Sequence, residues 1–507
     1  MSQAVKATPK PYLLTKSLLV SGLQCTKKLW LDVHQPLKQD LHIFYIGNRF
    51  GEFARTQYGP GVDLTGNLDA SSAIAQTQSA LNSLKVQVIY EAAFLHNDTF
   101  VRVDVLIRRP EGWEMIEVKS STKLKDEHIK DASIQTYIAQ ACGIKVVKIQ
   151  IAHINNAFVY SANHDYSGFL IEVDITNPAN DLQSLVPDWI ANLKPFAKTG
   201  AADPEVVMGE QCTKPHNCPY QSRCGSLIPQ LAEVPISILP NASKDLIEEF
   251  AIKNVHDLRD VPLERFSNPK HLVIHQAHTN NSQWISPSTI LNINAMDWPR
   301  YFMDFETVQQ GVPMLPGTKA YDALPFQWSV HRWDNPKQIL NVNDGMGFLE
   351  FFSPHMDRQF LVSLLDAVGT KGTIFVHNAS FERSKLRFLA KRPACIDLAD
   401  ATEALITRIV DTLDIAREGF YAPQMMGSYS LKDIVKAIPT SVDYSSEDGL
   451  SSGGDAQIAW FKCTDANTPP EEKLKWEKKL KKYCAQDTLA MYDFIRYLEQ
   501  DIQTQPL

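Results

Sequence analysis

The chain has 507 residues, a net charge of −8 and 44% hydrophobic residues, an ordinary composition for a globular protein of two to four domains. No run approaches the length of about 18 apolar residues that a membrane-spanning helix needs, and the excess of acids argues against a protein that coats nucleic acid by charge alone. The first residues, MSQAVKATPKPYLL, lack an apolar signal core, so we expect a cytoplasmic protein without a membrane partner.

The N-terminal part of the chain has the pattern of an α/β domain with a mixed sheet. Apolar alternation and turn residues predict a short helix that Ser17 caps and that ends before Cys25, and a second helix over GNRFGEFAR. The remaining elements are a helix over 70–84, strands over 85–94, 99–109 and 112–121, a helix over 125–142, and strands over 145–154 and 157–162.

Three residues of this domain, Asp104, Glu117 and Lys119, could form a metal centre. Glu117 and Lys119 are two apart on one predicted strand, so they face the same side, and Asp104 on the preceding strand can meet them across the ladder. Two acids can hold a divalent cation, and the lysine ammonium can stabilise phosphate charge or position water. A half-exposed hairpin with a cross-strand salt bridge is the alternative for this pattern alone.

The surrounding residues favour the metal centre. Glu91 lies one strand earlier, and Gln135 and Tyr137 lie on the following helix, DASIQTYIAQACG. This order resembles the PD-(D/E)xK nucleases of the RecB type, including the nuclease of CRISPR adaptation complexes. The resemblance implies that Asp104 and Glu117 are metal ligands, that Lys119 is catalytic, and that Gln135 and Tyr137 belong to the helix motif. The family often has an upstream histidine; here only Glu52 lies at that place, and Glu91 is the other candidate for the role.

Three cysteines follow in QCTKPHNCPYQSRCG, at positions 212, 218 and 224. In an intracellular protein this clustering points to a metal or cluster site rather than to disulfides. Cys25 precedes the nuclease-like segment, and one cysteine before it and three after it resemble the iron–sulfur members of the RecB type. The resemblance implies that Cys25, Cys212, Cys218 and Cys224 bind a [4Fe–4S] cluster. Zinc on the last three with Cys25 or His216 is the alternative.

Residues 230–298 have a different character, with a proline-rich start and two or three short predicted helices. We interpret them as a small helical connector between an N-terminal domain over 1–229 and a C-terminal domain over 299–507. A helix-hairpin-helix module and a plain linker domain are both compatible with this stretch.

The C-terminal domain begins with an apolar strand, YFMDFET, that carries Asp304 and Glu306 on one face. Burying two neighbouring carboxylates is costly unless a cation compensates them, and hard carboxylates suit Mg²⁺ or Mn²⁺. Solvent-facing acids at a strand end are the alternative. Further strands are predicted over 324–333, near 338–353, over 373–376 and over 411–416, with helices over 354–368, 427–438 and 481–498.

Two later motifs support a metal site. Glu382 follows Asn378 at a strand-to-helix junction, and Tyr483 and Asp487 share one helix face. The order D-x-E, N-x-x-x-E and Y-x-x-x-D resembles the DnaQ-like exonucleases, the DEDD group of the RNase H fold, in its tyrosine-bearing subtype. The resemblance implies that Asp304, Glu306, Glu382 and Asp487 hold two metals and that Tyr483 orients the attacking water. Glu382 departs from the family, which usually has Asp there.

The sequence therefore predicts an α/β protein: a PD-(D/E)xK domain with an iron–sulfur cluster, a helical connector and an RNase H-like domain. The arrangement resembles bacterial fusions of these two nuclease types. It implies a Mg²⁺- or Mn²⁺-dependent hydrolase, an exonuclease that acts on DNA ends or single strands, in DNA repair or in antiviral defence against foreign DNA. No G-x-x-x-x-G-K-[ST] motif is present, so a helicase or other repair partner would supply unwinding.

The sequence leaves three alternatives open: one active and one decayed site, an RNA substrate, or a non-catalytic nucleic-acid-binding scaffold. Basic stretches at 383–392 and 473–482 are either nucleic-acid contacts or solvated helix faces.

Overall fold

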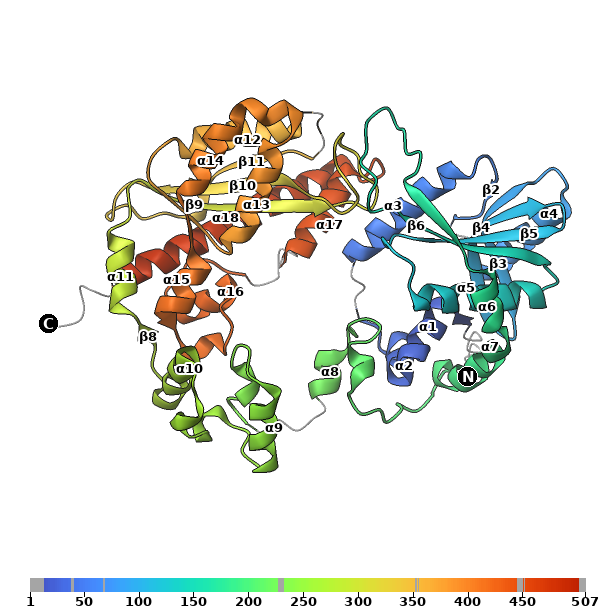
Figure 1. Cartoon of the computed structure of the whole chain (residues 1–507), viewed down its shortest axis with the longest axis horizontal. Coiled ribbons are helices and arrows are strands. Elements are labelled where there is room, and N and C mark those ends of the chain that lie inside the picture. Colours follow the sequence, from blue (N-terminus) through green and yellow to red (C-terminus); the bar gives the residue numbers. More distant parts are fainter. Residues whose placement is uncertain are drawn as a thin grey trace, which may run out of the picture. The chain divides into compact units, whose positions relative to one another are not determined.

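The protein is described by a computed structural model over residues 13–37, 41–66, 69–226, 232–351, 353, 355–444, 450 and 452–500. Its internal contacts divide the chain into two compact units, shown in Figure 1. Unit 1 comprises residues 1–229 and 310–321, and unit 2 comprises residues 230–309 and 322–507.

Unit 1 is built on a seven-stranded mixed sheet in which the path β2-β3-β4-β5-β6-β7 is joined by β1, which pairs with β4. The strands β3, β4 and β5 form an antiparallel meander, and α5 connects β5 to the parallel strand β6. The strands are β1 (Leu14–Thr15), β2 (Val62–Asp63), β3 (Val88–His96), β4 (Thr99–Arg109), β5 (Gly112–Lys119), β6 (Val146–Ile154) and β7 (Leu170–Asp174). The helices are α1 (Lys16–Gln24), α2 (Thr26–His34), α3 (Leu41–Gln57), α4 (Ala70–Asn82), α5 (Asp126–Ala141), α6 (Thr176–Asp181), α7 (Val186–Ala197) and α8 (Gln221–Ser226).

Two details of unit 1 differ from the sequence prediction. Thr15, not Ser17, caps the first helix, because its hydroxyl accepts the Leu18 N–H. Residues 157–162 do not form a strand. Their apolar side chains pack in a loop instead, and the Tyr160 backbone exchanges two hydrogen bonds with residues 317 and 318. The last strand of the sheet is therefore β7, further along the chain.

Unit 2 contains a five-stranded sheet in the order β11-β10-β9-β12-β13. The first three strands are antiparallel and the last two run parallel to β9. The strands of this unit are β8 (Trp284–Ile285), β9 (Arg300–Gln309), β10 (Ala323–Trp333), β11 (Met346–Leu349), β12 (Thr373–Val376), β13 (Ile409–Asp411) and β14 (Phe420–Tyr421). The helices are α9 (Lys244–Ile252), α10 (Pro269–Asn280), α11 (Pro287–Asn294), α12 (Met356–Val368), α13 (Ala379–Ala390), α14 (Ala399–Thr407), α15 (Thr412–Gly419), α16 (Leu431–Ile434), α17 (Gly453–Thr464) and α18 (Pro470–Gln500).

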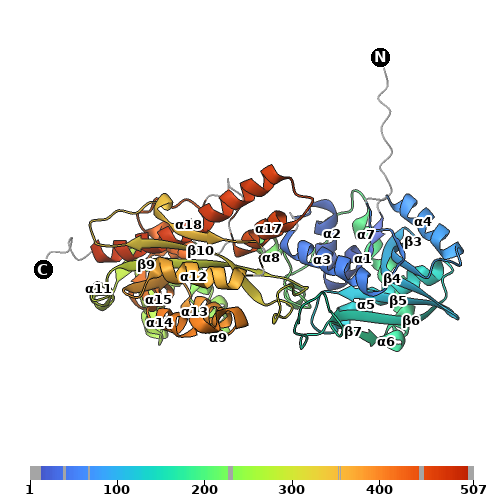
Figure 2. The same ribbon diagram turned by 90° about the horizontal axis from the view of Figure 1, so that it is seen from above.

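The two faces of this sheet are covered by different helices, with α17 and α18 on one side and α12 and α13 on the other (Figure 2). Strand β9 alternates accordingly. Tyr301, Met303 and Phe305 pack with the α12 and α13 side chains, whereas Phe302 packs with residues of α18. Period-two alternation therefore places Asp304 and Glu306 on the face that α18 covers.

The segment predicted as a connector, residues 230–298, shares a hydrophobic core with the C-terminal domain. Val234, Phe250 and Ile274 lie in the same buried cluster as Phe302 and Trp333. The strand predicted over 411–416 lies earlier, at Ile409–Asp411, and the rest of the predicted range belongs to α15. The strand ends at Asp411, whose carboxylate caps α15 by accepting the Leu413 N–H.

No helix among the described residues is both long and apolar enough to cross a membrane.

Candidate metal centres and cysteine site

The first carboxylate cluster lies in the middle of the unit 1 sheet. Strands β4 and β5 pair with Val105 opposite Ile116, so Asp104 and Glu117 are neighbours across the ladder. The Asp104 Oδ2 atom accepts the Val118 N–H at 2.7 Å, and this bond fixes the orientation of its carboxylate. Glu117 is almost fully buried, at 1% exposure.

Glu117 is surrounded by donors from three elements. The Lys119 Nζ atom lies 2.6 Å and the Lys16 Nζ atom 2.8 Å from its Oε1 atom, and Gln135 of α5 donates to its Oε2 atom. Lys119 also forms an ion pair with Asp131, one helical turn before Gln135. The structure thus brings the predicted Asp104, Glu117, Lys119 and Gln135 together, and adds Lys16 and Asp131, which the sequence patterns did not single out.

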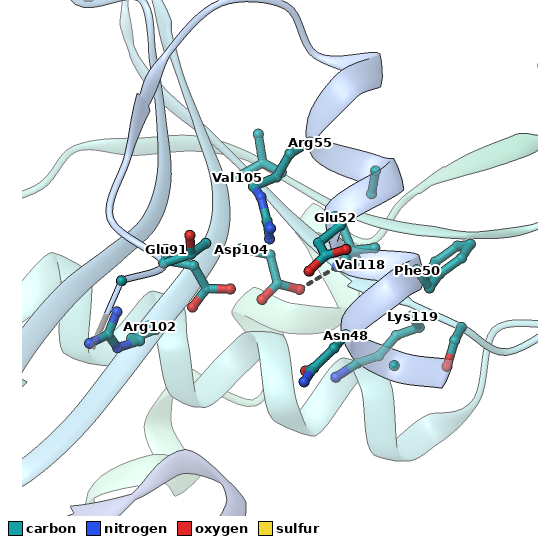
Figure 3. Close-up of a pocket in the computed structure, with 16 residues that line it drawn as sticks. Asn48, Phe50, Glu52, Arg55, Glu91, Arg102, Asp104, Val105, Val118 and Lys119 are labelled. Carbon is teal, nitrogen blue, oxygen red and sulfur yellow. Dashed lines mark hydrogen bonds between the residues drawn. The ribbon is translucent and has the colours of Figure 1, made fainter. Parts of the chain in front are cut away.

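A pocket of about 680 Å³ opens on this cluster and is lined by Asp104, Lys119 and residues of α3. Figure 3 shows the carboxylates of Glu91 and Glu52 pointing toward Asp104, with the Arg55 guanidinium entering from α3. Both Glu52 and Glu91, the two sequence candidates for the upstream ligand, therefore face the same acid.

Glu91 has a left-handed backbone conformation, with φ of 57°. This conformation is uncommon for a residue with a side chain and is found where surrounding structure enforces it, often at functional sites. Tyr90 and Ala92, two apart on β3, pack in different hydrophobic clusters, as do the residues of β4 that pair with them, Val105 and Val103. The kink aims the Glu91 carboxylate into the pocket (Figure 3).

The charges of this cluster are unevenly matched. Burial and the negative charge of Glu117 raise the pKa of Asp104 well above its usual range. Burial alone would also raise the pKa of Glu117, yet the ammonium groups of Lys119 and Lys16 outweigh it and hold that pKa well below its usual range. Burial raises the pKa of Glu91 as well. A divalent cation between Asp104 and Glu91 would favour the ionised form of both carboxylates.

Tyr137, the other residue of the predicted helix motif, lies elsewhere. Its side chain packs against the hydrophobic core of unit 1, and its ring centroid is 6.2 Å from that of His96. Residues two apart on a helix point in nearly opposite directions, so α5 cannot present Gln135 and Tyr137 to the same acid.

The second carboxylate cluster lies between β9 and α18 of unit 2. One ligand atom from each of Asp304, Glu306 and Cys484 lies within 4.8 Å of the other two. The Cys484 Sγ atom is 3.6 Å from Asp304 Oδ2 and fully buried. The structure places this buried sulfur among the acids, where no sequence motif had indicated a cysteine.

Two further predicted acids surround this group. Glu382, in the first turn of α13, is 3% exposed, and its Oε2 atom has no hydrogen-bond partner among the described residues. Asp487 of α18 accepts a hydrogen bond of 2.6 Å at Oδ1 from the Tyr444 hydroxyl. Tyr483, buried beside Asp487, also contributes a side-chain hydrogen bond to it.

One lysine lies beside the two tyrosines of this cluster. The Lys432 Nζ atom is 5.3 Å from the ring centroid of Tyr444 and 5.5 Å from that of Tyr483. Neither Lys432 nor Tyr444 was predicted as a site residue, although Lys432 falls in the helix predicted over 427–438.

Among the described residues, no acid of unit 2 is paired with two lysines as Glu117 is, although the charge of Lys432 acts to lower the pKa of Glu306 and Asp487. Burial, together with the charge of Asp487, raises the pKa of Asp304 well above its usual range. Burial and the neighbouring Asp304 do the same for Glu306 and for Glu382. Four acids that disfavour ionisation in one place form a set that a multivalent cation would stabilise.

The cysteine site lies in unit 1. Cys25, at the junction of α1 and α2, and the three cysteines of the 212–224 segment line one pocket. The Gln24 side chain links the helix before Cys25 to the segment that carries the other three cysteines. It donates hydrogen bonds to the carbonyl oxygens of Gln211 and His216. The His216 imidazole itself lies 2.6 Å from the Glu127 carboxylate, so it is paired outside the sulfur set.

Two kinds of bound group, a zinc ion and an iron–sulfur cluster, are predicted for this pocket. A tetrahedral zinc site with Zn–S bonds of about 2.3 Å holds its sulfurs about 3.8 Å apart. Among the described residues, no three of these cysteines bring their sulfurs within 4.8 Å of one another. An iron–sulfur cube is larger, because each thiolate binds a different iron atom. Which of the two groups this pocket binds stays a prediction.

The two basic stretches differ in their contacts. Around 383–392, Arg383 donates to the Ile409 carbonyl, Arg387 pairs with Glu403 and Arg392 pairs with Asp357, so these cations serve internal contacts. In α18, by contrast, the lysines at 475, 478, 481 and 482 are exposed just before Tyr483.

Comparison with known proteins adds one finding. Residues 301–430 match a family model described as a domain of unknown function, DUF2779. The match covers β9 to the start of α16 and contains Asp304, Glu306 and Glu382, but not Asp487. A search of curated proteins gave no match.

Proposed function

We propose that the protein is a metal-dependent nuclease with two hydrolytic centres, one in each unit, that cleave phosphodiester bonds of DNA ends or single strands. The observation that carries the proposal is the presence of two separate sets of buried or half-buried carboxylates, each assembled from several strands or helices. Buried acids that are not neutralised by neighbours cost stability, and a bound divalent cation is the usual compensation.

In the first centre, Asp104, Glu117 and Glu91 would hold the metal, which lowers the pKa of a bound water and polarises the phosphate. Lys119 is placed to hold that water or to neutralise charge on the phosphate, because its ammonium already contacts Glu117. Gln135 holds the second oxygen of Glu117 and so fixes the ligand. The order of these residues supports the resemblance to RecB-type nucleases.

In the second centre, Asp304, Glu306, Glu382 and Asp487 would hold the metals. Glu382 is buried close enough to Asp304 to have its pKa raised by it, which supports a ligand role for the longer side chain. Tyr483, hydrogen-bonded to Asp487, would orient the attacking water. The sheet, with three antiparallel strands followed by two parallel ones, supports the resemblance to the RNase H fold.

The cysteine site would hold a [4Fe–4S] cluster that joins the two ends of the N-terminal domain. The shared pocket supports one ligand set of these four cysteines, and the resemblance to the iron–sulfur members of the RecB type favours the cluster over zinc. Its role in the proposal is structural, since it closes a chain loop between Cys25 and Cys212.

The decisive experiment is a cleavage assay on end-labelled single- and double-stranded DNA and RNA with Mg²⁺ or Mn²⁺. Wild type, Asp304→Ala, Glu117→Ala and the double variant are prepared without oxygen. If the two single variants lose different activities, both centres act, and the products give the polarity. If one single variant retains all activity, its centre is inactive. A wild type that cuts no substrate with any metal would favour the non-catalytic scaffold instead.

A further inference from the structure

Glu117 Oε1 accepts from two ammonium groups rather than one. The E-x-K pattern supplies only Lys119, on the same strand. The second donor, Lys16, lies 101 residues earlier in the chain and contacts the same oxygen at 2.8 Å. Its Nζ atom is also 3.6 Å from Asp131 Oδ2, so it touches both acids that Lys119 touches.

The fold places Lys16 there by two features. Strand β1 pairs in parallel with β4, the strand that carries Asp104, and α1 begins directly after β1 with Lys16 as its first residue. Thr15 caps this helix, and Cys25 ends it. One short helix therefore connects the carboxylate cluster of unit 1 to the cysteine site.

The two lysines occupy lone pairs that a metal would need. A carboxylate oxygen has two lone pairs, and both acceptor positions of Glu117 Oε1 are used by the lysines. Coordination of a cation through this oxygen would require one ammonium group to leave it. The Lys16 side chain is 20% exposed, so its flexible stem can move.

We propose that Lys16 is a second catalytic lysine of this centre, which pairs with Glu117 until a metal is bound and then binds a phosphate oxygen of the substrate. A phosphodiester brings negative charge to the centre, where Arg55, Arg102 and Lys119 line the pocket, and an ammonium released from Glu117 would add a further cation that can meet this charge. The inference rests on the proposed nuclease function and assigns a residue that the E-x-K motif does not contain.

The test separates metal binding from turnover. In the full-length chain carrying Asp304→Asn and Glu306→Gln, which disable the second centre, Mn²⁺ binding is measured by calorimetry and electron paramagnetic resonance, and cleavage of labelled DNA is measured in parallel. We expect Lys16→Met to bind Mn²⁺ as tightly as the parent or up to about tenfold more tightly, because a competing cation is gone. We expect its cleavage rate to fall about 100-fold.

Two companion variants control the result. Lys16→Arg keeps the charge and is expected to retain most of the cleavage, and Lys16→Gln, which also removes the charge, replaces Lys16→Met if that variant does not fold. Lys130→Met changes an exposed lysine of α5 next to Asp131 and is expected to leave both measurements unchanged.

The outcomes are distinguishable from failure of the proposed function. Mn²⁺ binding that weakens in parallel with cleavage would overturn the inference, because Lys16 would then only hold Glu117 in place. Unchanged cleavage in Lys16→Met would overturn it as well. Persistent cleavage in Glu117→Gln would instead contradict the nuclease centre itself.

Discussion

The Tyr444 hydroxyl donates a 2.6 Å hydrogen bond to Asp487, an acid of the second carboxylate cluster. Tyr444 stands 43 residues before Asp487 in the chain, outside the three motifs that indicate this centre. Asp487 thus has two tyrosine neighbours, one on its own helix and one from a preceding loop, and both favour its ionised form. The hydrogen bond from Tyr444 to Asp487 can be tested by removing the Tyr444 hydroxyl.

Removing the Tyr444 hydroxyl should weaken the second centre most at low pH. Tyr444→Phe deletes a donor that lowers the pKa of Asp487, so this acid becomes easier to protonate. A hydrogen bond to a charged group contributes about 1.5–3 kcal/mol, so we expect a loss of about 10- to 100-fold in activity. The pH–rate profile of the activity that Asp304→Ala abolishes should shift its acidic limb to higher pH.

Tyr497→Phe is the matched control for this prediction. Tyr497 lies on α18, and its hydroxyl donates a hydrogen bond to the side chain of Gln283, outside the cluster. Equal losses in the two variants would show that the effect of Tyr444 is on the fold.

Replacing a buried acid should stabilise the metal-free protein at neutral pH. The folded-state pKa of Asp304 is raised, so the folded protein retains a proton that the unfolded chain releases above about pH 4. Stability is therefore lost as the pH rises from the unfolded pKa toward the folded one. Asp304→Asn removes this loss, and each 1 kcal/mol gained raises Tm by about 2–4 °C.

The measurement is thermal unfolding with chelator at pH 4 and at pH 7.5. We expect Asp304→Asn to gain more in Tm at pH 7.5 than at pH 4. Asp366→Asn, at an exposed position of α12, should show no gain in Tm. Mn²⁺ should raise Tm of the wild type by mass action more than that of Asp304→Asn. A variant that is less stable at both pH values would contradict the electrostatic argument.

A negative charge at Gln135 should disable the first centre. Gln135 donates to Glu117 Oε2, and Gln135→Glu replaces this donor with a like charge that raises the pKa of Glu117. Loss of such a supporting residue costs about 10- to 100-fold in metal affinity. Titration of the cleavage reaction with Mn²⁺ measures this loss of metal affinity. Gln140→Glu, an exposed change on the same helix, should have no effect; similar losses in both would point to the helix charge alone.

The four cysteines of the shared pocket should act as one ligand set. Cys25→Ser, Cys212→Ser, Cys218→Ser or Cys224→Ser should each remove most of the iron and the visible absorption from protein prepared without oxygen, and should lower Tm. Cys142→Ser changes a thiol whose partner is the Leu95 carbonyl, and should leave the iron content unchanged. One equivalent of zinc and no iron in the wild type would show that the four cysteines bind zinc instead of an iron–sulfur cluster.

Several parts of this protein could be predicted from local pattern. The two-residue spacing of Asp304 and Glu306 predicts a shared strand face, and the helix over 126–141 follows from its composition. These predictions succeed because side-chain direction within one element depends only on its own periodicity. The same reasoning was wrong for residues 157–162, where apolar side chains pack a loop rather than a strand.

The sequence by itself determined the acids, the E-x-K strand and the cysteines, because each lies in a short motif with fixed spacing. Only the tertiary structure decided which charges meet: Lys16 with Glu117, Cys484 with Asp304, and Tyr444 with Asp487. It also separated Tyr137 from Gln135. The physical reason is that electrostatic interaction and hydrogen bonding depend on distance through space, which sheet pairing and helix packing set between segments that no local period connects.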